Sequence, residues 1–165
     1  MIETAIEVTE GHVDAGVIQE ILEAGRAMHR HPVEPLPHAH ETLERLAGQY
    51  RIVLVTKGDL FDQERKLAQS GLGDFFDGVE IVSDKTAETY ARVFARHGEG
   101  AERSMMVGNS LRSDVLPALA AGSWGVHVPH HLTWQLEHAA APIAEPRFRE
   151  LPDLGGLPGL LETLS

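Results

Sequence analysis

Polar side chains that suit phosphate chemistry occur at or shortly after the ends of three short, largely apolar runs of the sequence. A hydroxyl, an ammonium and a carboxylate are groups that bind a phosphoryl group or the metal ion that neutralises it. The three are Thr56 after residues 52–55, Lys85 after residues 79–82, and Asp114 after residues 104–107. The sequence therefore indicates a site for phosphoryl chemistry that is built from three separate segments.

The first two segments suit the phosphoryl group itself. The hydroxyl of Thr56 can donate to one phosphoryl oxygen, and the backbone amides of Lys57 and Gly58 can donate to others. Lys85 supplies a compact point charge. Taken singly, Thr56 is also a common kind of turn residue and Lys85 a common kind of solvated surface residue. The prediction therefore depends on their occurring together, in order, after successive apolar runs.

The third segment suits a metal ion. Asp114, together with the amide oxygen of Asn109, offers the oxygen ligands that Mg²⁺ takes in proteins. By itself, Asp114 would most simply be a residue at the start of a helix, where the helix dipole favours a carboxylate.

The spacing of apolar residues predicts the elements that position these side chains. Short unbroken apolar runs are typical of strands buried on both faces, and a period near 3.6 is typical of amphipathic helices. Strands are expected at residues 52–55, 79–82, 104–107 and 124–128. Helices are expected at about residues 14–29, 38–47, 59–70, 86–97, 114–121 and 157–164. This alternation predicts an α/β fold with a doubly wound parallel sheet, whose carboxyl edge gathers the three polar segments.

These segments resemble the motifs of the haloacid dehalogenase superfamily of hydrolases. Residues 52–56 resemble its second motif and Lys85 its third. Residues 108–114 resemble its fourth motif, in the variant that has Asn after the glycine. The resemblance covers roughly residues 36–128 and implies a Rossmann-like α/β core.

The resemblance also implies roles for the individual residues. It implies that Thr56 and Lys85 act at the phosphoryl group, and that Asp114 and Asn109 help to hold Mg²⁺. It implies that residues 1–34 are the remnant of a helical cap over the site, and that residues 35–165 form the core. The activity it implies is Mg²⁺-dependent hydrolysis of a small phosphorylated metabolite.

One motif of the superfamily is not in the sequence. The superfamily opens with an apolar strand that ends in an Asp-x-Asp pair, whose first Asp attacks phosphorus and whose second is the general acid/base. The 165 residues contain no Asp-x-Asp. Covalent catalysis needs its nucleophile in the site. We therefore expect the chain to start inside the cap, as a truncated or degenerate form, and to turn over little or no substrate.

The resemblance places the missing strand at the centre of the sheet, between the strands at residues 52–55 and 104–107. Its absence would expose two apolar strand edges, which are templates for pairing. We expect either that the two neighbours close up, or that another segment or a second copy fills the gap. Residues 4–9 alternate in a β-like manner and are a candidate for the filling segment.

Composition and charge exclude several classes of partner. The formal net charge of −11 disfavours a nucleic-acid backbone or an anionic membrane surface, because both are negatively charged. There is no cysteine, so disulfides and thiolate metal sites are excluded. The first residues lack the basic and apolar regions of a signal peptide, and we expect a cytoplasmic protein. Zinc sites can use closely spaced histidines, but such histidines are more often part of a solvated polar stretch. Seven of the ten histidines occur at short spacings: His29, His31, His38, His40, His127, His130 and His131.

Two further functions fit parts of the pattern. A non-catalytic phosphate-binding or oligomerisation module with the same fold would keep the phosphate pocket without the nucleophile. A receiver domain of the response-regulator kind also uses a hydroxyl and a lysine on a doubly wound sheet. It needs an acceptor Asp at a strand end, and none is evident in the sequence.

Overall fold

The computed structural model describes residues 1–164, and Ser165 lies outside the described residues. The chain divides into two units, Met1–Glu34 and Pro35–Ser165. No helix among the described residues is long and apolar enough to cross a membrane. The elements that carry the candidate site all belong to the second unit.

The first unit consists of helices α1 (Ile2–Val8) and α2 (Ala15–Arg30). Helix α2 begins after Asp14, whose carboxylate accepts a hydrogen bond of 2.7 Å from the amide of Gly16. The expectation that residues 4–9 form a filling strand is wrong, because residues 2–8 are helical. A helix satisfies its backbone groups locally, whereas a strand needs a partner edge. That this unit is the remnant of a cap stays a prediction.

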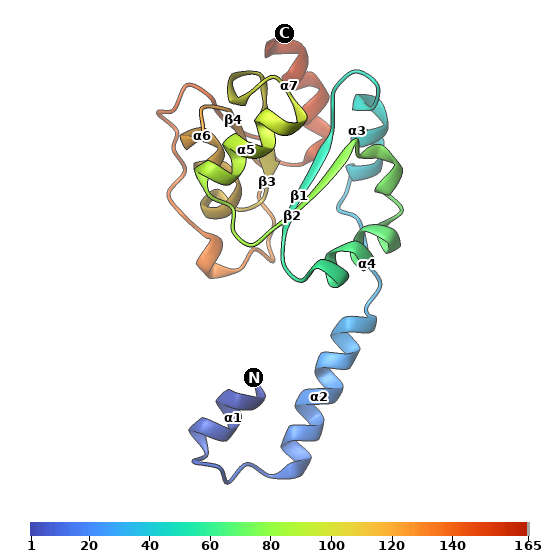
Figure 1. The fold of residues 1–165 in the computed structure, drawn as a ribbon, viewed down its shortest axis with the longest axis vertical. Coiled ribbons are helices and arrows are strands. Elements are labelled where there is room, and N and C mark those ends of the chain that lie inside the picture. The colour runs from blue at the N-terminus through green and yellow to red at the C-terminus, as the bar shows by residue number, and fades with distance from the viewer. Residues whose placement is uncertain (165) are drawn as a thin grey trace. The chain divides into compact units, whose positions relative to one another are not determined.

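The second unit contains parallel strands in two separate sheets (Figure 1). One sheet pairs β1 (Val53–Lys57) with β2 (Gly78–Val82). The other has the order β3-β4-β5, with bounds Met105–Gly108, Trp124–His127 and Phe148–Glu150. The α/β class with parallel strands is confirmed, and four of the strands were predicted. The short strand β5 was not predicted, because it lies in a segment interrupted by prolines.

The closing of β1 onto β3, which was one of two expected outcomes, does not occur. Strand β1 pairs with β2 and strand β3 with β4, and the two sheets remain separate. Helices pack around both sheets and hold them in one unit. They are α3 (Ala39–Leu46), α4 (Leu60–Ser70), α5 (Ala87–His97), α6 (Leu116–Ala120) and α7 (Leu157–Leu164).

Local sequence explains where the helices next to the site begin and end. Asp59 accepts a hydrogen bond from the amide of Asp62 and starts α4, which ends at Gly71 in a left-handed conformation (φ 70°). Thr86 accepts a hydrogen bond from the amide of Thr89 and starts α5. A π-helical turn, Leu111–Val115, precedes α6. Such turns are frequent at functional sites.

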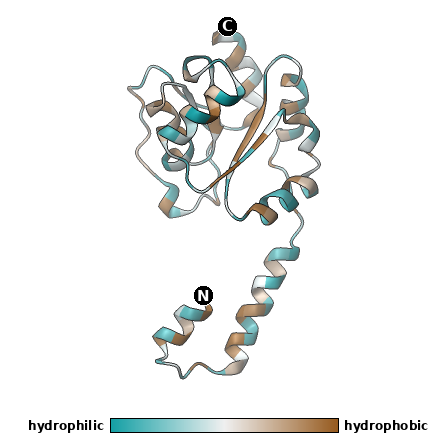
Figure 2. Ribbon diagram, viewed as in Figure 1, coloured by the Kyte–Doolittle hydropathy of each residue, from teal (hydrophilic) through white to brown (hydrophobic). Residues whose placement is uncertain are grey.

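The core of the unit joins the two sheets through a shared helix. Tyr90 and Phe94 of α5 form a buried cluster with Ala118 of α6. Val55 of β1 and Met106 of β3 both pack against this cluster, so each sheet contributes one strand to it. Hydrophobic residues are coloured brown in Figure 2, where they run along the strands. Burial of apolar surface therefore holds β1 and β3 against the same helix although they do not pair.

A cavity of about 780 Å³ lies between β1 and β3. Its lining includes residues 53–55 of β1 and residues 105–107 of β3, with side chains from α3, α5 and α7. We call this cavity the strand groove. Its two strand walls are the facing edges that the sequence predicted to be exposed.

The packing of β4 generates a first prediction. A methyl group on Gly125 would lie 2.9 Å from Cγ of Leu119 and 3.0 Å from Cγ1 of Val115. Gly125→Ala should lower the free energy of unfolding by about 1–3 kcal/mol, because a well-packed core resists added volume. Urea denaturation followed by circular dichroism measures this change. The matched control is Gly73→Ala, whose methyl group would meet nothing within 4 Å, and an equal loss in both variants would contradict the packing argument.

Candidate functional site

A second cavity, of about 250 Å³, lies at the carboxyl ends of β1, β2 and β3. It brings together five of the six residues that the sequence singled out, and Gly58 is not among its lining residues. The lining consists of Thr56, Lys57, Lys85, Asn109, Ser110, Ser113, Asp114, Leu132, Thr133, Trp134 and Glu137. We call this cavity the polar pocket. Three loops that are distant in sequence therefore meet where the parallel-sheet argument placed them.

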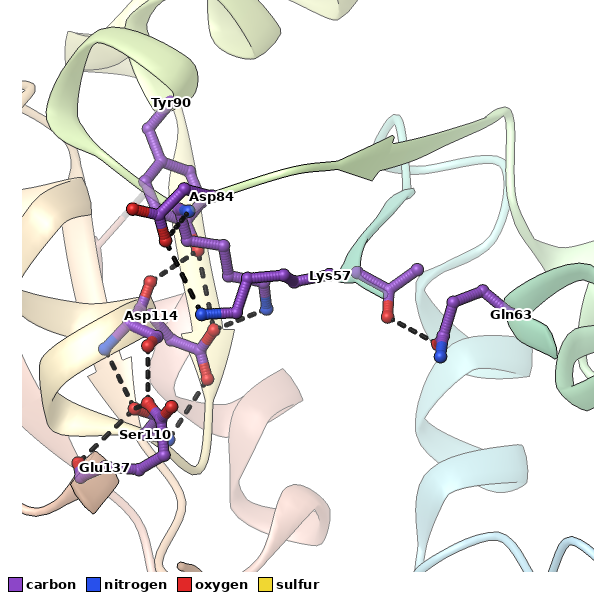
Figure 3. A network of polar contacts seen from close by, with 10 residues as sticks. Lys57, Gln63, Asp84, Tyr90, Ser110, Asp114 and Glu137 are labelled. Atoms are coloured by element: carbon purple, nitrogen blue, oxygen red, sulfur yellow. Dashed lines mark hydrogen bonds and ion pairs between the residues drawn. The ribbon is translucent and has the colours of Figure 1, made fainter. Parts of the chain in front are cut away.

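Lys85 and Asp114, which both line the polar pocket, form an ion pair. The Lys85 ammonium lies 2.7 Å from Oδ1 of Asp114, and the side chains are only 14% and 6% exposed. Figure 3 shows Asp114 with its neighbours Ser110 and Tyr90. The amide of Ser110 donates to Oδ2 of Asp114 at 3.0 Å. Tyr90 lies with its hydroxyl 3.5 Å from Oδ1 and donates to the carbonyl of Ser113 at 3.1 Å. Both carboxylate oxygens of Asp114 thus accept protein hydrogen bonds.

A glycine next to this carboxylate is required by space. A side chain on Gly108, the last residue of β3, would collide with the carboxyl group of Asp114. The π-helical turn that follows brings Asp114 back toward the strand end. The glycine at position 108 is therefore explained by the close approach of backbone and carboxylate.

The polar residues at the end of β1 are already engaged with protein groups. Thr56 donates its hydroxyl hydrogen to Oε1 of Gln63 at 2.8 Å. Lys57 extends its ammonium to 3.5 Å from the carboxylate of Asp84 (Figure 3). Gly58 has φ +150°, and a methyl group there would lie 2.8 Å from Nε2 of Gln63. Donation from Thr56 to a ligand requires its hydroxyl to rotate away from Gln63.

Glu137 is a pocket residue that the sequence did not indicate. Its Oε2 accepts hydrogen bonds from the hydroxyls of Ser110, at 2.5 Å, and Ser113. These two hydrogen bonds, Ser110 first, hold the pKa of the Glu137 carboxyl below its usual range. Glu137 lies in a short 3₁₀ helix, Gln135–Glu137, inside an irregular segment. No motif or periodicity marks that position, so only the tertiary structure reveals it.

The donor set of the polar pocket does not form a complete Mg²⁺ site. Asp114 is engaged through both oxygens, and Asn109 donates its amide hydrogen to the hydroxyl of Thr133 at 2.8 Å. The amide oxygen of Asn109 is, with Asp114, the other Mg²⁺ ligand that the sequence predicts. Among residues 1–164 no group of three or more His, Cys, Asp or Glu side chains is placed to hold a metal ion. Mg²⁺ prefers near-octahedral oxygen coordination, which these residues alone do not supply.

Three of the closely spaced histidines contact other side chains. His127 lies 2.8 Å from the carboxylate of Glu150, across the β4–β5 pair. His130 and His131 pack their rings at 4.6 Å between centroids. These contacts concern His127, His130 and His131 alone.

The comparison with family models identifies one matching family. A model of the haloacid dehalogenase-like hydrolases matches residues 4–122, which is more than half of the chain. Among curated proteins, the chain is 32% identical over 108 residues to a glyceraldehyde 3-phosphate phosphatase from Methanothermobacter thermautotrophicus. That match covers 61% of this chain and 47% of the relative, so the chain spans about half of the relative's length.

The chain is also similar to solved structures of haloacid dehalogenase-like hydrolases. A haloacid dehalogenase-like family hydrolase from Xanthomonas campestris is 48% identical, with a TM-score of 0.86, and the match covers 99% of this chain and 65% of that one. A hydrolase of the same kind from Bacillus subtilis, solved with magnesium bound, is 23% identical with a TM-score of 0.64. That match covers 76% of this chain and 55% of that one, and at this identity it supports the fold alone.

The position of Tyr90 generates a prediction about alkaline pH. Burial, and then the charge of Asp114, raise the pKa of the Tyr90 hydroxyl above its ordinary value. Above a pH of about 10 the unfolded chain loses this proton while the native state keeps it, so the free energy of unfolding falls as pH rises. Tyr90→Phe should remove this contribution and flatten the decline between pH 9 and 11.

The measurement is urea denaturation at a series of pH values. At pH 7, Tyr90→Phe should cost about 0.5–1.5 kcal/mol, because the hydrogen bond to the Ser113 carbonyl is lost. Tyr50→Phe is the matched control, since Tyr50 is 41% exposed. A decline for Tyr90→Phe as steep as that of the unmodified chain would contradict the assignment.

Proposed function

The chain belongs to the haloacid dehalogenase-like hydrolase family, and from this premise we propose that its polar pocket binds the phosphoryl group of a small phosphorylated molecule. The observation that carries the proposal is the convergence of Thr56, Lys85 and Asp114 from three strand ends on one cavity. The curated relative that acts as a phosphatase on glyceraldehyde 3-phosphate supports the same class of ligand.

Each pocket residue has a role in this proposal. Lys85 provides positive charge for phosphoryl oxygens, and Asp114 fixes its position through the 2.7 Å ion pair. Thr56 provides a hydroxyl donor once it leaves Gln63, and the amides of Lys57 and Gly58 follow it at the strand end. Phosphoryl transfer depends mainly on such positioning and charge stabilisation.

The charges of the pocket limit how strongly it binds an anion. Two ammonium groups, Lys57 and Lys85, are balanced by two carboxylates, Asp114 and Glu137. A phosphate dianion therefore gains little net attraction from these side chains alone. A bound Mg²⁺ would supply the missing positive charge, and Asp114 with Asn109 are the residues proposed to contribute to holding it. Because their donor set is incomplete, no catalytic step is assigned to the metal.

We further propose that these 165 residues turn over phosphate esters slowly or not at all. The reason is the absence of an Asp-x-Asp sequence and of any other carboxylate in the polar pocket that is free of hydroxyl, amide or ammonium donors. A phosphate-binding module without catalysis is the second candidate function, and the same observation favours it. A cytoplasmic location also stays a proposal.

The experiment measures phosphate binding and phosphate release separately. Inorganic phosphate at tens of millimolar with Mg²⁺ should raise the melting temperature, because a ligand that binds only the native state stabilises it. Thr56→Val, a change of similar volume at the strand end, and Lys85→Met should each abolish this shift. Lys66→Met is the matched control, since Lys66 pairs with Asp62 on the surface of α4.

Lys85→Met leaves the Asp114 carboxylate buried without its partner and is expected to be destabilised. The double variant Lys85→Met/Asp114→Leu removes both charges and keeps the binding test valid if the single variant does not fold. Absence of a phosphate shift in the unmodified chain would refute the binding proposal. Metal-dependent release of phosphate from p-nitrophenyl phosphate, well above the rate of the Lys85→Met variant, would refute the proposal of low turnover.

A further inference from the structure

We propose that the polar pocket takes a phosphate monoester that carries a quaternary ammonium group, and that Trp134 and Glu137 bind the ammonium. This inference rests on the proposed function, since it takes the phosphoryl group to bind at Thr56 and Lys85 and adds the chemistry of the rest of the ligand. Its evidence is an exposed tryptophan and a charged carboxylate that line the same cavity as the phosphate-type residues.

Trp134 is an exposed aromatic residue in the lining of the polar pocket. It is 69% exposed, and Leu132, another lining residue, is 75% exposed. Single exposed apolar residues are common on protein surfaces, whereas two that line one cavity form a surface that suits a ligand. Leu136 is also exposed but is not among the lining residues, so it serves below as a control.

Hydrogen bonds fix the segment that carries Trp134 to the loop after β3. The side-chain amide of Asn109 donates to the hydroxyl of Thr133 at 2.8 Å. The backbone amide of Glu137 donates to the carbonyl of Trp134 at 2.8 Å, which closes the turn between these two residues. Because the segment is held on both sides of Trp134, little conformational freedom remains to be lost when a ligand binds.

Glu137 presents a negative charge in the same turn. Its Oε2 accepts hydrogen bonds from the hydroxyls of Ser110 and Ser113, and Figure 3 shows Glu137 beside Ser110. Its Oε1 accepts no hydrogen bond from residues 1–164. Since these hydroxyls, Ser110 first, hold the pKa of the carboxyl below its usual range, Glu137 is ionised at neutral pH. One oxygen of a charged carboxylate is therefore open to a cation.

The charges of the polar pocket match a zwitterion better than a phosphate group alone. Lys57 and Lys85, at and after the ends of β1 and β2, carry positive charge, and Glu137, from the segment after β4, carries negative charge. Asp114 is already paired with Lys85. A ligand with a phosphate at one end and a cation at the other gives both signs a partner, whereas inorganic phosphate is repelled by Glu137.

A quaternary ammonium suits this wall better than a primary one. A primary ammonium has three N–H donors that need acceptors. The wall offers Oε1 of Glu137, while the hydroxyl of Thr133 already accepts from Asn109. A quaternary ammonium has no donor, and an aromatic face together with a carboxylate is sufficient to bind it. The cavity volume of about 250 Å³ also favours a short molecule, because pockets for larger ligands measure about 300–1,000 Å³.

The test compares two phosphate monoesters that differ in one atom. Phosphocholine carries the quaternary nitrogen, and 3,3-dimethylbutyl phosphate has carbon in its place. Isothermal titration calorimetry with Mg²⁺ should show that phosphocholine binds about tenfold more tightly, because only its ammonium is attracted by an aromatic face and a carboxylate. Phosphoethanolamine, which has a primary ammonium, should bind more weakly than phosphocholine.

Trp134 variants test the aromatic contribution. Trp134→Leu should reduce the preference for phosphocholine over its carbon analogue to about twofold, because the carboxylate remains and the ring is lost. Trp134→Phe should restore part of the preference. Leu136→Ala, on the same segment and outside the lining, should keep the full preference. The melting-temperature shift with inorganic phosphate should persist in Trp134→Leu, which shows that the variant is folded.

Glu137→Gln should change two affinities in opposite directions. It should lower the preference for phosphocholine, because the charge that attracts the ammonium is gone. It should raise the affinity for inorganic phosphate, because the charge that repels the anion is gone. A purely structural role of Glu137 would weaken both. Glu145→Gln is the matched control, since Glu145 is exposed and outside the lining, and it should change neither.

The outcomes separate this inference from the proposed function. If inorganic phosphate binds but the carbon analogue binds as tightly as phosphocholine, the ammonium site is refuted and the phosphate site stands. An unchanged preference in Trp134→Leu would also refute it, and so would tighter binding of phosphoethanolamine than of phosphocholine. If none of the three monoesters and no inorganic phosphate binds, both proposals fail.

Discussion

The Lys85–Asp114 ion pair is the interaction on which the arrangement of the second unit depends. Lys85 follows β2 in one sheet, and Asp114 follows β3 in the other, so the pair connects two sheets that share no backbone ladder. The side chains are almost fully buried, and loss of one partner from such a pair costs about 3–5 kcal/mol. Tyr90 reinforces the connection from α5 through Ser113.

The same connection relates the two cavities. The polar pocket lies at the carboxyl ends of the strands, where charged and hydroxyl groups satisfy one another. The strand groove runs between β1 and β3 and is apolar along its strand walls. Packing of Val55 and Met106 on the Tyr90–Phe94–Ala118 cluster keeps the groove walls in place. Ion pairing at one end and apolar packing along the length thus maintain a gap that no described strand fills.

The contacts made by the carboxylates of the polar pocket explain why the family relationship does not by itself establish an activity. Family membership is shown by a match that covers residues 4–122. The carboxylates that the structure places in the pocket are occupied, Asp114 by Lys85 and Ser110, and Glu137 by Ser110 and Ser113. Occupied carboxylates hold other groups in position, whereas attack on phosphorus requires one that is available.

The sequence by itself determined the α/β class, the four longer parallel strands and the positions of Thr56, Lys85 and Asp114, because apolar runs and caps act locally. The absence of a central strand, which the resemblance implies, stays a prediction. Only the tertiary structure decided that β1 and β3 stay apart, that residues 2–8 are helical, and that Glu137 enters the pocket. Each of these depends on contacts between residues far apart in the chain or on the absence of a partner edge, and local patterns do not encode either.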